Sequence, residues 1–235
     1  MRKATLLIGF VVITGSVAAA QEAKPLKRTV TEKAENFSTP SVATILKNAS
    51  AAYTKVRTLK AEFTQNRQNP LLGSNTSSHG MLMQKKPDLI LLKFNRPMGD
   101  IIVGDGKYFW VYYPSTDKRQ VLRAPASMGG ARGVDLQAQF LGDPTRKFTS
   151  TFNGIESVGG RKAYVLTMTP RENQGYKTLK VWVDAKDWLA RRFIITENNG
   201  VVQDFTLSNL AVNSPINNSV FRFTPPADAR IVTRP

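Results

Sequence analysis

Apolar and polar residues alternate with a period of two along most of the chain, and this alternation is typical of half-buried β-strands. It begins after Leu59 and predicts eleven short strands, joined by turns such as Gly159-Gly160 and Asn198-Asn199-Gly200. The predicted strands span residues 61–68, 78–84, 88–95, 100–104, 107–113, 118–123, 146–153, 161–169, 176–184, 190–197 and 201–210. Such a series predicts an antiparallel meander, either a strongly curved sheet or an open, incomplete β-barrel.

One predicted hairpin is apolar on both of its faces. Every residue from Tyr108 to Tyr113 is apolar or aromatic, and Gly104-Asp105-Gly106 supplies the tight turn before them. A strand with one solvated face would alternate, so both faces of this hairpin are expected to be covered. In the later strands the alternation is regular and predicts an inner face. Its expected residues are Tyr164, Leu166, Met168, Leu179, Val181, Val183, Phe193, Ile195, Phe205 and Leu207.

A single helix is predicted before the strands. Thr39 is the expected N-cap and Pro40 occupies the first helical position, where a missing N–H costs nothing. Apolar residues then recur at helical spacing and form one stripe, which has to lie on an apolar surface. They are Val42, Ile45, Leu46, Ala49, Ala52, Tyr53 and Val56. The predicted fold class is therefore mainly β with a few helices (α+β).

The segment over residues 124–144 interrupts the strands. Residues 127–133 are rich in glycine, and residues 134–141 predict a short helix that ends before Asp143-Pro144. The helix has its apolar residues on one side: Leu136, Phe140 and Leu141. The segment is either a lid over the concave face of the sheet or an ordinary surface loop.

The 235-residue chain begins with the features of a secretory signal peptide. Arg2 and Lys3 precede an apolar run over residues 4–17, and Ala18-Ala19-Ala20 supplies a small-residue cleavage site. Cleavage after Ala20 is expected, with an uncleaved anchor as the alternative. Residues 21–38 contain many charges and are expected to form a flexible basic leader before a single domain over residues 39–235.

The chain is strongly basic and contains no cysteine. With 33 Lys and Arg against 17 Asp and Glu, its formal net charge is +16, which falls to +14 once Arg2 and Lys3 are removed. An exported chain rarely meets nucleic acid, so anionic lipid head groups or acidic protein surfaces are the expected counterparts. Without cysteine the fold has no disulfides, and Gln21 cannot bear the acyl chains of a lipoprotein.

No residue pattern typical of catalysis, of a metal site or of a cofactor site is evident. His79, the only histidine, is expected at the surface, with a catalytic role as the alternative. Gly104-Asp105-Gly106-Lys107 lies inside a hairpin, whereas a phosphate-binding loop opens a helix. Asp184 and Asp187 flank a turn and are expected to form it rather than to act as an acid and base pair.

Four groups of residues, considered together, resemble a known family. They are Phe63-Thr64-Gln65, Gly80 with Lys85-Lys86-Pro87-Asp88, Asp105-Gly106-Lys107 with Trp110-Val111-Tyr112-Tyr113-Pro114, and Phe221-Arg222-Phe223-Thr224-Pro225-Pro226. In order and spacing they are similar to the periplasmic outer-membrane lipoprotein carriers of the LolA family. The resemblance extends from about Thr39 to the C-terminus and so covers the whole predicted domain.

This resemblance implies an open barrel with an N-terminal helix and a helical lid, whose apolar cavity holds lipoprotein acyl chains in the periplasm without an enzymatic step or a cofactor. It also implies a monomer that receives its cargo from an inner-membrane ABC transporter and passes it to an outer-membrane acceptor. The candidate lining residues, for which the alternative is a plain core position, are Phe63, Met81, Met83, Leu91, Phe94, Ile102, Phe109, Val111, Leu166, Phe193 and Phe205.

One residue departs from the family pattern. Where this chain has Lys86, the carriers have an arginine whose guanidinium hydrogen-bonds the closed lid. Lysine keeps the charge but lacks the planar fork of donors, so Lys86 is expected to be a weaker latch. The cargo is then a lipoprotein, another envelope lipid or a glycolipid. A periplasmic lipid-sensing module of the same fold and an envelope enzyme with an unrecognised site stay open as other functions.

Overall fold

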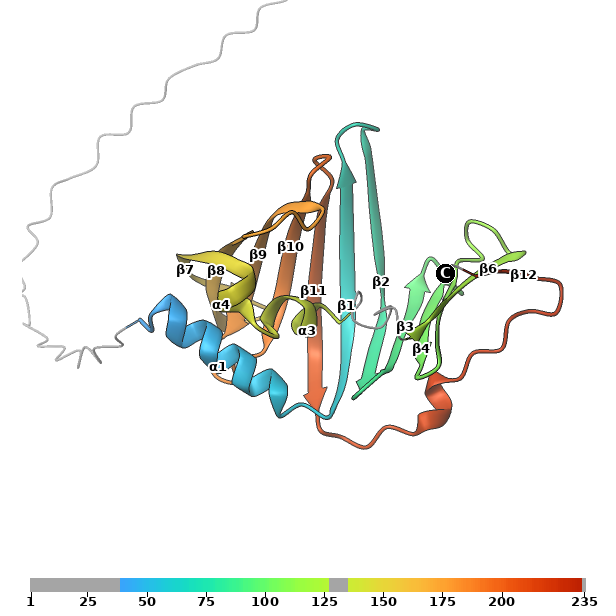
Figure 1. The fold of residues 1–235 in the computed structure, drawn as a ribbon, viewed down its shortest axis with the longest axis horizontal. Helices are drawn as coiled ribbons and strands as arrows, with labels where there is room; N and C mark the ends of the chain where they lie inside the picture. Colours follow the sequence, from blue (N-terminus) through green and yellow to red (C-terminus); the bar gives the residue numbers. More distant parts are fainter. Residues whose placement is uncertain (1–38, 127–134, 234–235) are drawn as a thin grey trace, which may run out of the picture. The chain divides into compact units, whose positions relative to one another are not determined.

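The predicted strands assemble into one twelve-stranded sheet in the computed structural model, which describes residues 39–126 and 135–233 (Figure 1). The strands are β1 (Thr58–Asn69), β2 (Ser74–Lys85), β3 (Leu89–Arg96), β4 (Ile101–Asp105), β5 (Tyr108–Tyr112), β6 (Gln120–Pro125), β7 (Phe148–Val158), β8 (Arg161–Pro170), β9 (Tyr176–Asp184), β10 (Ala190–Glu197), β11 (Val202–Val212) and β12 (Arg230–Thr233). Their order is β12-β6-β5-β4-β3-β2-β1-β11-β10-β9-β8-β7. The eleven predicted strands are all present, and β12 is an additional strand that pairs parallel to β6.

Two meanders, β1 to β6 and β7 to β11, meet where β1 pairs with β11. At this seam the Thr58 hydroxyl donates a hydrogen bond to the carbonyl of Ser214 at 2.6 Å, although the two residues are 156 positions apart. β6 and β7 lie near opposite ends of the strand order. The segment that connects them therefore has to cross the sheet, and its described part contains two short helices.

The helices of the described residues are α1 (Val42–Thr54), α3 (Leu136–Leu141), α4 (Pro144–Lys147) and the 3-10 helix η2 (Asn218–Phe221). The prediction of Thr39 as the N-cap of α1 is wrong, because the Oγ of Ser41 accepts a hydrogen bond from the Thr44 amide at 3.1 Å. α3 lies inside the predicted helix over residues 134–141. Gly142 is its C-cap, and Pro144 begins α4 instead of simply ending the helical segment. In the described part of the chain, none of the helices has the length and apolar character needed to span a bilayer.

The largest apolar cluster lies on the face of the sheet that carries α1 and α3, called the inner face below. The buried side of α1 contributes Ile45, Leu46, Ala49 and Tyr53. All of the inner-face residues predicted in β8 to β11 belong to this cluster or pack against it, so the alternation predicted this face correctly. The ring of Phe63 lies 5.1 Å from that of Phe94 and 5.3 Å from that of Phe205, which joins the two meanders across the seam.

The hairpin of β4 and β5 is covered on both faces, as predicted. Phe109 and Val111 pack against the inner cluster. On the outer face, Trp110 is buried in a second cluster with Phe221 and Phe223, and the ring of Phe223 lies 5.8 Å from that of Trp110. The C-terminal segment that contains η2 and β12 therefore covers the outer face of this hairpin.

Candidate functional site

α3 lies on the inner face with its apolar side buried against the sheet (Figure 1). Phe140 and Leu141 are 1% and 0% exposed, and Leu136 packs against the same cluster. The ring of Phe140 lies 5.9 Å from that of Phe193 on β10 and 5.7 Å from that of Tyr176 on β9. The structure thus places the three predicted lid residues together on the inner face, whereas residues 127–134 of the predicted lid lie outside the described residues.

A group of polar side chains attaches the start of α3 to α1 and β2. Asp135 is the N-cap of α3, because its Oδ1 accepts a hydrogen bond from the Ala138 amide at 3.0 Å. Its Oδ2 accepts hydrogen bonds from the Tyr53 hydroxyl of α1 and from the Gln84 Nε2 of β2. Gln84 also donates to the Tyr53 oxygen at 2.9 Å. Tyr53, Gln84 and Asp135, called the α3 anchor below, therefore form a closed triangle of hydrogen bonds.

Burial is the largest influence on the pKa of the Tyr53 hydroxyl. Burial and the neighbouring Asp135 carboxylate together raise the pKa of Tyr53 well above its usual range, so this hydroxyl stays a donor at every physiological pH. Gln84 is 7% exposed and lies beside Leu82 on the inner face. A buried amide and a buried hydroxyl are costly to leave without partners. The α3 anchor therefore favours the conformation in which α3 covers the sheet.

Lys86 contacts the last turn of α1 at Tyr53, one of the residues of the α3 anchor. Its Nζ donates a hydrogen bond to the Tyr53 carbonyl at 2.7 Å and lies 3.9 Å from the centre of the Tyr53 ring. Burial lowers the pKa of Lys86, and the Asp135 carboxylate opposes that shift. The observed contacts of Lys86 hold the last turn of α1, and the predicted latch between Lys86 and the lid stays a prediction, because residues 127–134 of the predicted lid lie outside the described residues.

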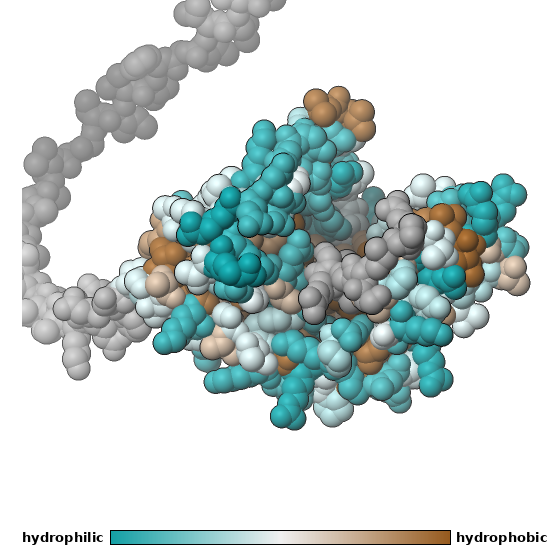
Figure 2. Space-filling model, viewed as in Figure 1, coloured by the Kyte–Doolittle hydropathy of each residue, from teal (hydrophilic) through white to brown (hydrophobic). Residues whose placement is uncertain are grey.

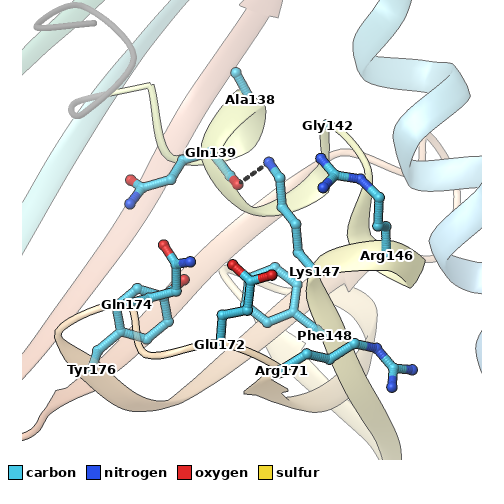
Figure 3. A pocket seen from close by; sticks show the side chains of 10 residues that line it. All are labelled: Ala138, Gln139, Gly142, Arg146, Lys147, Phe148, Arg171, Glu172, Gln174 and Tyr176. Carbon is cyan, nitrogen blue, oxygen red and sulfur yellow. Dashed lines mark hydrogen bonds between the residues drawn. The ribbon is translucent and has the colours of Figure 1, made fainter.

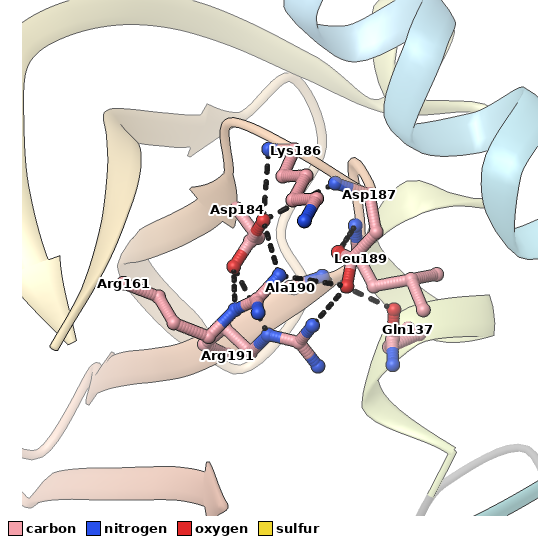
Figure 4. Close-up of polar contacts among 8 residues, drawn as sticks. All are labelled: Gln137, Arg161, Asp184, Lys186, Asp187, Leu189, Ala190 and Arg191. Carbon is pink, nitrogen blue, oxygen red and sulfur yellow. Dashed lines mark hydrogen bonds and ion pairs between the residues drawn. The ribbon is translucent and has the colours of Figure 1, made fainter. Parts of the chain in front are cut away.

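A second polar attachment joins α3 to β10. Gln137 is 4% exposed, and its Oε1 accepts a hydrogen bond from the Ala190 amide at 3.3 Å. Within residues 39–126 and 135–233, its Nε2 has no hydrogen-bond partner. Figure 4 shows that Gln137 lies next to a turn held by ion pairs, which join Asp184 and Asp187 to Arg161 and Arg191. α3 is therefore attached to the sheet at a second point, beside a charged turn.

Asp184 and Asp187 form the turn, as predicted, and are not arranged as an acid and base pair. Asp184 accepts hydrogen bonds from the amides of Lys186 and Asp187 at 2.8 and 3.2 Å. Burial of Asp184 opposes its ionisation, but hydrogen bonds from Arg161 and from those two amides lower the pKa of Asp184 to about 2. The ion pairs with Arg161 and Arg191 are not predicted by the sequence, because the partners come from β8 and β10.

Little space remains between α3 and the inner face. The cavity there has a volume of about 10 Å³, which is roughly the space that one water molecule occupies. Its lining consists of Leu59, Leu82, Gln84, Ile90, Asp135, Leu136, Gln137, Phe193, Phe205 and Leu207. With α3 in this position, this cavity is too small for an acyl chain.

Eight of the candidate lining residues lie together on the inner face. They are Phe63, Phe94, Ile102, Phe109, Val111, Leu166, Phe193 and Phe205. Six of them are buried, and Phe109 and Val111 are partly buried. Only Phe193 and Phe205 of this set line the small cavity under α3. The others lie beside it in the same apolar cluster.

The structure places the remaining three candidates elsewhere. Leu91 is buried in the outer cluster and Met83 packs against that cluster. Met81 lies opposite Glu62 and Lys93 in the strand register, away from the buried side of β2. Grouping these three with the inner face is therefore wrong. The inward positions of β2 are Gly80, Leu82 and Gln84, so the methionines make the outward positions look like the more apolar side.

A larger pocket lies beside α3 and α4, where they meet the turn between β8 and β9 (Figure 3). Its volume is about 630 Å³. The lining is Ala138, Gln139, Gly142, Arg146, Lys147, Phe148, Arg171, Glu172, Gln174 and Tyr176. Lys147 donates from Nζ to the Gln139 carbonyl at 3.0 Å and so ties α4 to α3. The pocket is more charged than the inner face and has three cationic side chains against one carboxylate.

The described residues hold no group of three or more His, Asp or Glu side chains placed to bind a metal ion. His79 is exposed at the outer part of β2, as predicted. Gly104-Asp105-Gly106-Lys107 is a hairpin turn in which Asp105 accepts a hydrogen bond from the Lys107 amide at 2.8 Å. The geometry of the described residues is therefore that of an apolar surface under a short helical cover.

Residues 54–224 match the family model described as outer membrane lipoprotein carrier protein LolA. The chain belongs to the LolA family. This confirms the resemblance predicted from the sequence, and it places the chain in a family of carriers rather than in a family of enzymes.

Members of the LolA family from several bacteria are similar to this chain over most of its length. The outer-membrane lipoprotein carrier protein of Neisseria meningitidis serogroup B is 24% identical over 179 residues, which is 74% of this chain and 80% of that protein. The protein of the same description from Dechloromonas aromatica is 25% identical over 181 residues, with coverages of 75% and 81%.

Among solved structures, an uncharacterized conserved protein from Thermus thermophilus has a TM-score of 0.53 and 15% identity to this member of the LolA family. The likeness covers 83% of this chain and 100% of that protein. At this level of identity the likeness concerns the fold alone, and it agrees with the open, mainly β architecture predicted from the sequence.

Proposed function

We propose that this chain is a periplasmic carrier that shields the acyl chains of lipoproteins on its inner face and moves them from the inner to the outer membrane. The observation that supports this proposal most directly is the way in which α3 covers the inner face. The helix buries Phe140 and Leu141 on a wide apolar face, yet it is attached at its start by a few polar side chains. An apolar cover that is held by a small polar contact is well suited to exchange with an apolar ligand.

The free energy needed to lift α3 from the sheet is comparable to the free energy gained by burying an acyl chain. Lifting α3 would return Leu136, Phe140 and Leu141 to water at a cost on the order of 2 kcal/mol for each, or about 6 kcal/mol together. Burying an acyl chain recovers about 0.8 kcal/mol per methylene, so roughly eight buried methylenes offset the loss. Because the two terms nearly balance, cargo can be taken up and released without an energy source in the carrier itself.

The same proposal covers the route of the carrier. The first 20 residues act as a signal peptide that is removed after Ala20, residues 21–38 follow as a basic leader, and residues 39–235 bind the cargo. An inner-membrane ABC transporter supplies the lipoprotein, and an acceptor at the outer membrane receives it. Both partners are carried over from the family, and a basic surface favours anionic lipids or acidic partners at either end.

Mass spectrometry of material that co-purifies with the protein from the periplasm tests the cargo. The expected result is acylated lipoprotein. Recovery of a glycolipid or another envelope lipid in its place would keep the carrier and change the cargo, and recovery of no lipid from a folded protein would contradict the proposal.

Two neighbouring isoleucines on β10 offer a matched test of whether the inner face binds acyl chains. Both are partly buried, but Ile195 packs on the inner cluster and Ile194 on the outer side with Trp182. Ile195→Asn should lower the uptake of a fluorescent acyl probe, and Ile194→Asn should leave it unchanged. Thermal unfolding of both variants controls for stability, because each places an amide on a partly buried surface. Equal losses of uptake would rule out the inner face as the binding surface.

A further inference from the structure

The hairpin of β1 and β2 extends beyond its neighbour on one side. The two strands pair along their whole length, from Thr58 with Lys85 to Asn69 with Ser74. β3 pairs with β2 only as far as His79. Residues 74–78 therefore have no β3 partner, and at about 3.3 Å per residue the hairpin extends roughly 17 Å past the last β3 pair. Figure 1 shows this tip rising above the adjoining strands.

Two leucines occupy the tip of the hairpin. Leu71 and Leu72 are each 76% exposed, and Figure 2 shows an apolar patch at this tip above polar surroundings. Exposed pairs of large apolar side chains are unusual on a soluble surface when they lie at the end of an ordered projection. Met98, in the turn after β3, is 86% exposed at the same end of the sheet, because β1 and β3 run in the same direction.

The turn that presents the leucines is held by Asn69. Its side-chain Oδ1 accepts hydrogen bonds from the amides of Leu71 and Leu72 at 3.2 and 3.3 Å, and its carbonyl accepts a further bond from the Leu72 amide at 3.2 Å. Gly73 completes the turn with a φ of +59°, a conformation that glycine adopts at little cost. The leucines are thus displayed by an ordered turn and do not need to be ordered on binding.

The stem of the hairpin suits a lipid surface better than a protein surface. Residues 64–79 contain no Asp or Glu, and their charged or titratable side chains are Arg67 and His79. The other stem residues are mostly Ser, Thr, Asn and Gln, and protein interfaces draw most of their binding energy from Trp, Tyr and Arg rather than from Leu, Ser or Thr. A narrow convex tip also offers far less area than the roughly 1,000 Å² that a stable protein interface needs.

We propose that the tip over residues 69–74 docks the protein on a bilayer by inserting Leu71 and Leu72 among anionic lipid head groups. The apolar pair enters the boundary between head groups and acyl chains, at a depth of about 5 to 10 Å, while the stem, which has no acidic residue, crosses the head-group layer. The formal charge of +16, or +14 without Arg2 and Lys3, attracts the protein to such a surface. This docking goes beyond the proposed carrier function and does not depend on any cargo.

Vesicle binding by the form that begins at Gln21, and so lacks the apolar run over residues 4–17, tests the docking. The vesicles contain phosphatidylethanolamine with phosphatidylglycerol. We expect Leu71→Asn with Leu72→Asn to weaken binding by about tenfold or more, since two leucines lose their burial. The matched control, Thr76→Asn with Ser77→Asn, changes two exposed stem residues and should bind as the unchanged protein does. Unfolding temperatures should agree among all three, because the four positions are exposed.

A fluorescent label reports insertion directly. The chain has no cysteine, so a single cysteine carries a single label. A polarity-sensitive dye on Leu72→Cys should become brighter and shift to the blue with vesicles, whereas the same dye on Thr76→Cys should change much less.

Three results would overturn the docking. They are equal vesicle binding by the leucine variant and the unchanged protein, no spectral change at position 72, and no binding by the unchanged protein. If the leucine variant instead abolishes self-association in sedimentation, or capture of a purified protein acceptor, the tip serves that partner and not the bilayer.

Discussion

Tyr53→Phe removes one hydroxyl from the α3 anchor and should shift α3 toward an open state. The hydroxyl donates to the Asp135 carboxylate and accepts from Gln84, and the ring that packs against Lys86 is kept. A hydrogen bond to a charged group contributes about 2 kcal/mol, so the ratio of open to closed α3 should rise about thirtyfold. The variant tests the anchor without disturbing the apolar side of α3.

Amide exchange at α3 measures the effect. The Gln139 amide donates to the Asp135 carbonyl at 2.9 Å and the Gly142 amide to the Ala138 carbonyl at 3.2 Å, so both report the integrity of α3. Their exchange should become about thirtyfold faster in Tyr53→Phe, within the limit that global unfolding sets. An acyl probe should bind more tightly, because less free energy is needed to lift α3 before it binds.

Tyr112→Phe is the matched control. Its hydroxyl donates to the Lys118 carbonyl at 3.2 Å on the outer side of the sheet, so this variant also loses one hydroxyl and one hydrogen bond. Exchange at Gln139 and Gly142 should be unchanged in it. If both variants exchange at the same rate at these two amides, the α3 anchor does not hold α3 and the reasoning fails.

Three further predictions concern charge, packing and the latch. The pKa of Asp184, about 2, lies below the ordinary value of 3.8. Its ionised form therefore adds about 2 kcal/mol to the free energy of unfolding above pH 4, and this contribution is lost as the pH falls toward 2. Urea unfolding of Asp184→Asn should lack this part of the pH dependence. Gly80→Ala should reduce stability by about 3 kcal/mol or more in denaturant unfolding, because its Cβ would lie 2.1 Å from the Lys93 carbonyl oxygen. Lys86→Leu should speed amide exchange in α3 and at the end of α1 by roughly fivefold, because about 1 kcal/mol is lost with the hydrogen bond to the Tyr53 carbonyl. Lys86→Arg should slow the same exchange. Equal exchange rates in both variants would exclude Lys86 as a latch.

The strands were predictable because their signal is local. A period of two is visible within five or six residues, and on β8 to β11 one face is so consistently apolar that residues such as Leu179 and Phe193 were assigned to the inner face correctly. The same rule predicted the wrong inward residues for β2. Its inward positions include Gly80 and Gln84, so the outward methionines resembled the buried side.

The polar part of the site was not predictable in this way. Tyr53 and Asp135 are 82 residues apart, and Gln84 and Asp135 are 51 residues apart, so no spacing pattern links them. One clue was available: Tyr53 sits on the buried stripe of α1, where its hydroxyl needs a partner. The covering of the outer face by Phe221 and Phe223 was missed because the segment after β11 has no regular period.

The seam between β1 and β11 also governs the order in which the protein can fold. Because β1 pairs with β11, the last long strand, the inner face cannot be completed until nearly the whole chain is available for folding. Contacts at such sequence separation form late and slowly, since the entropy of closing a long loop has to be overcome first. A chain that crosses a membrane from its N-terminus would therefore remain unfolded during passage, and its apolar face would close only on the far side.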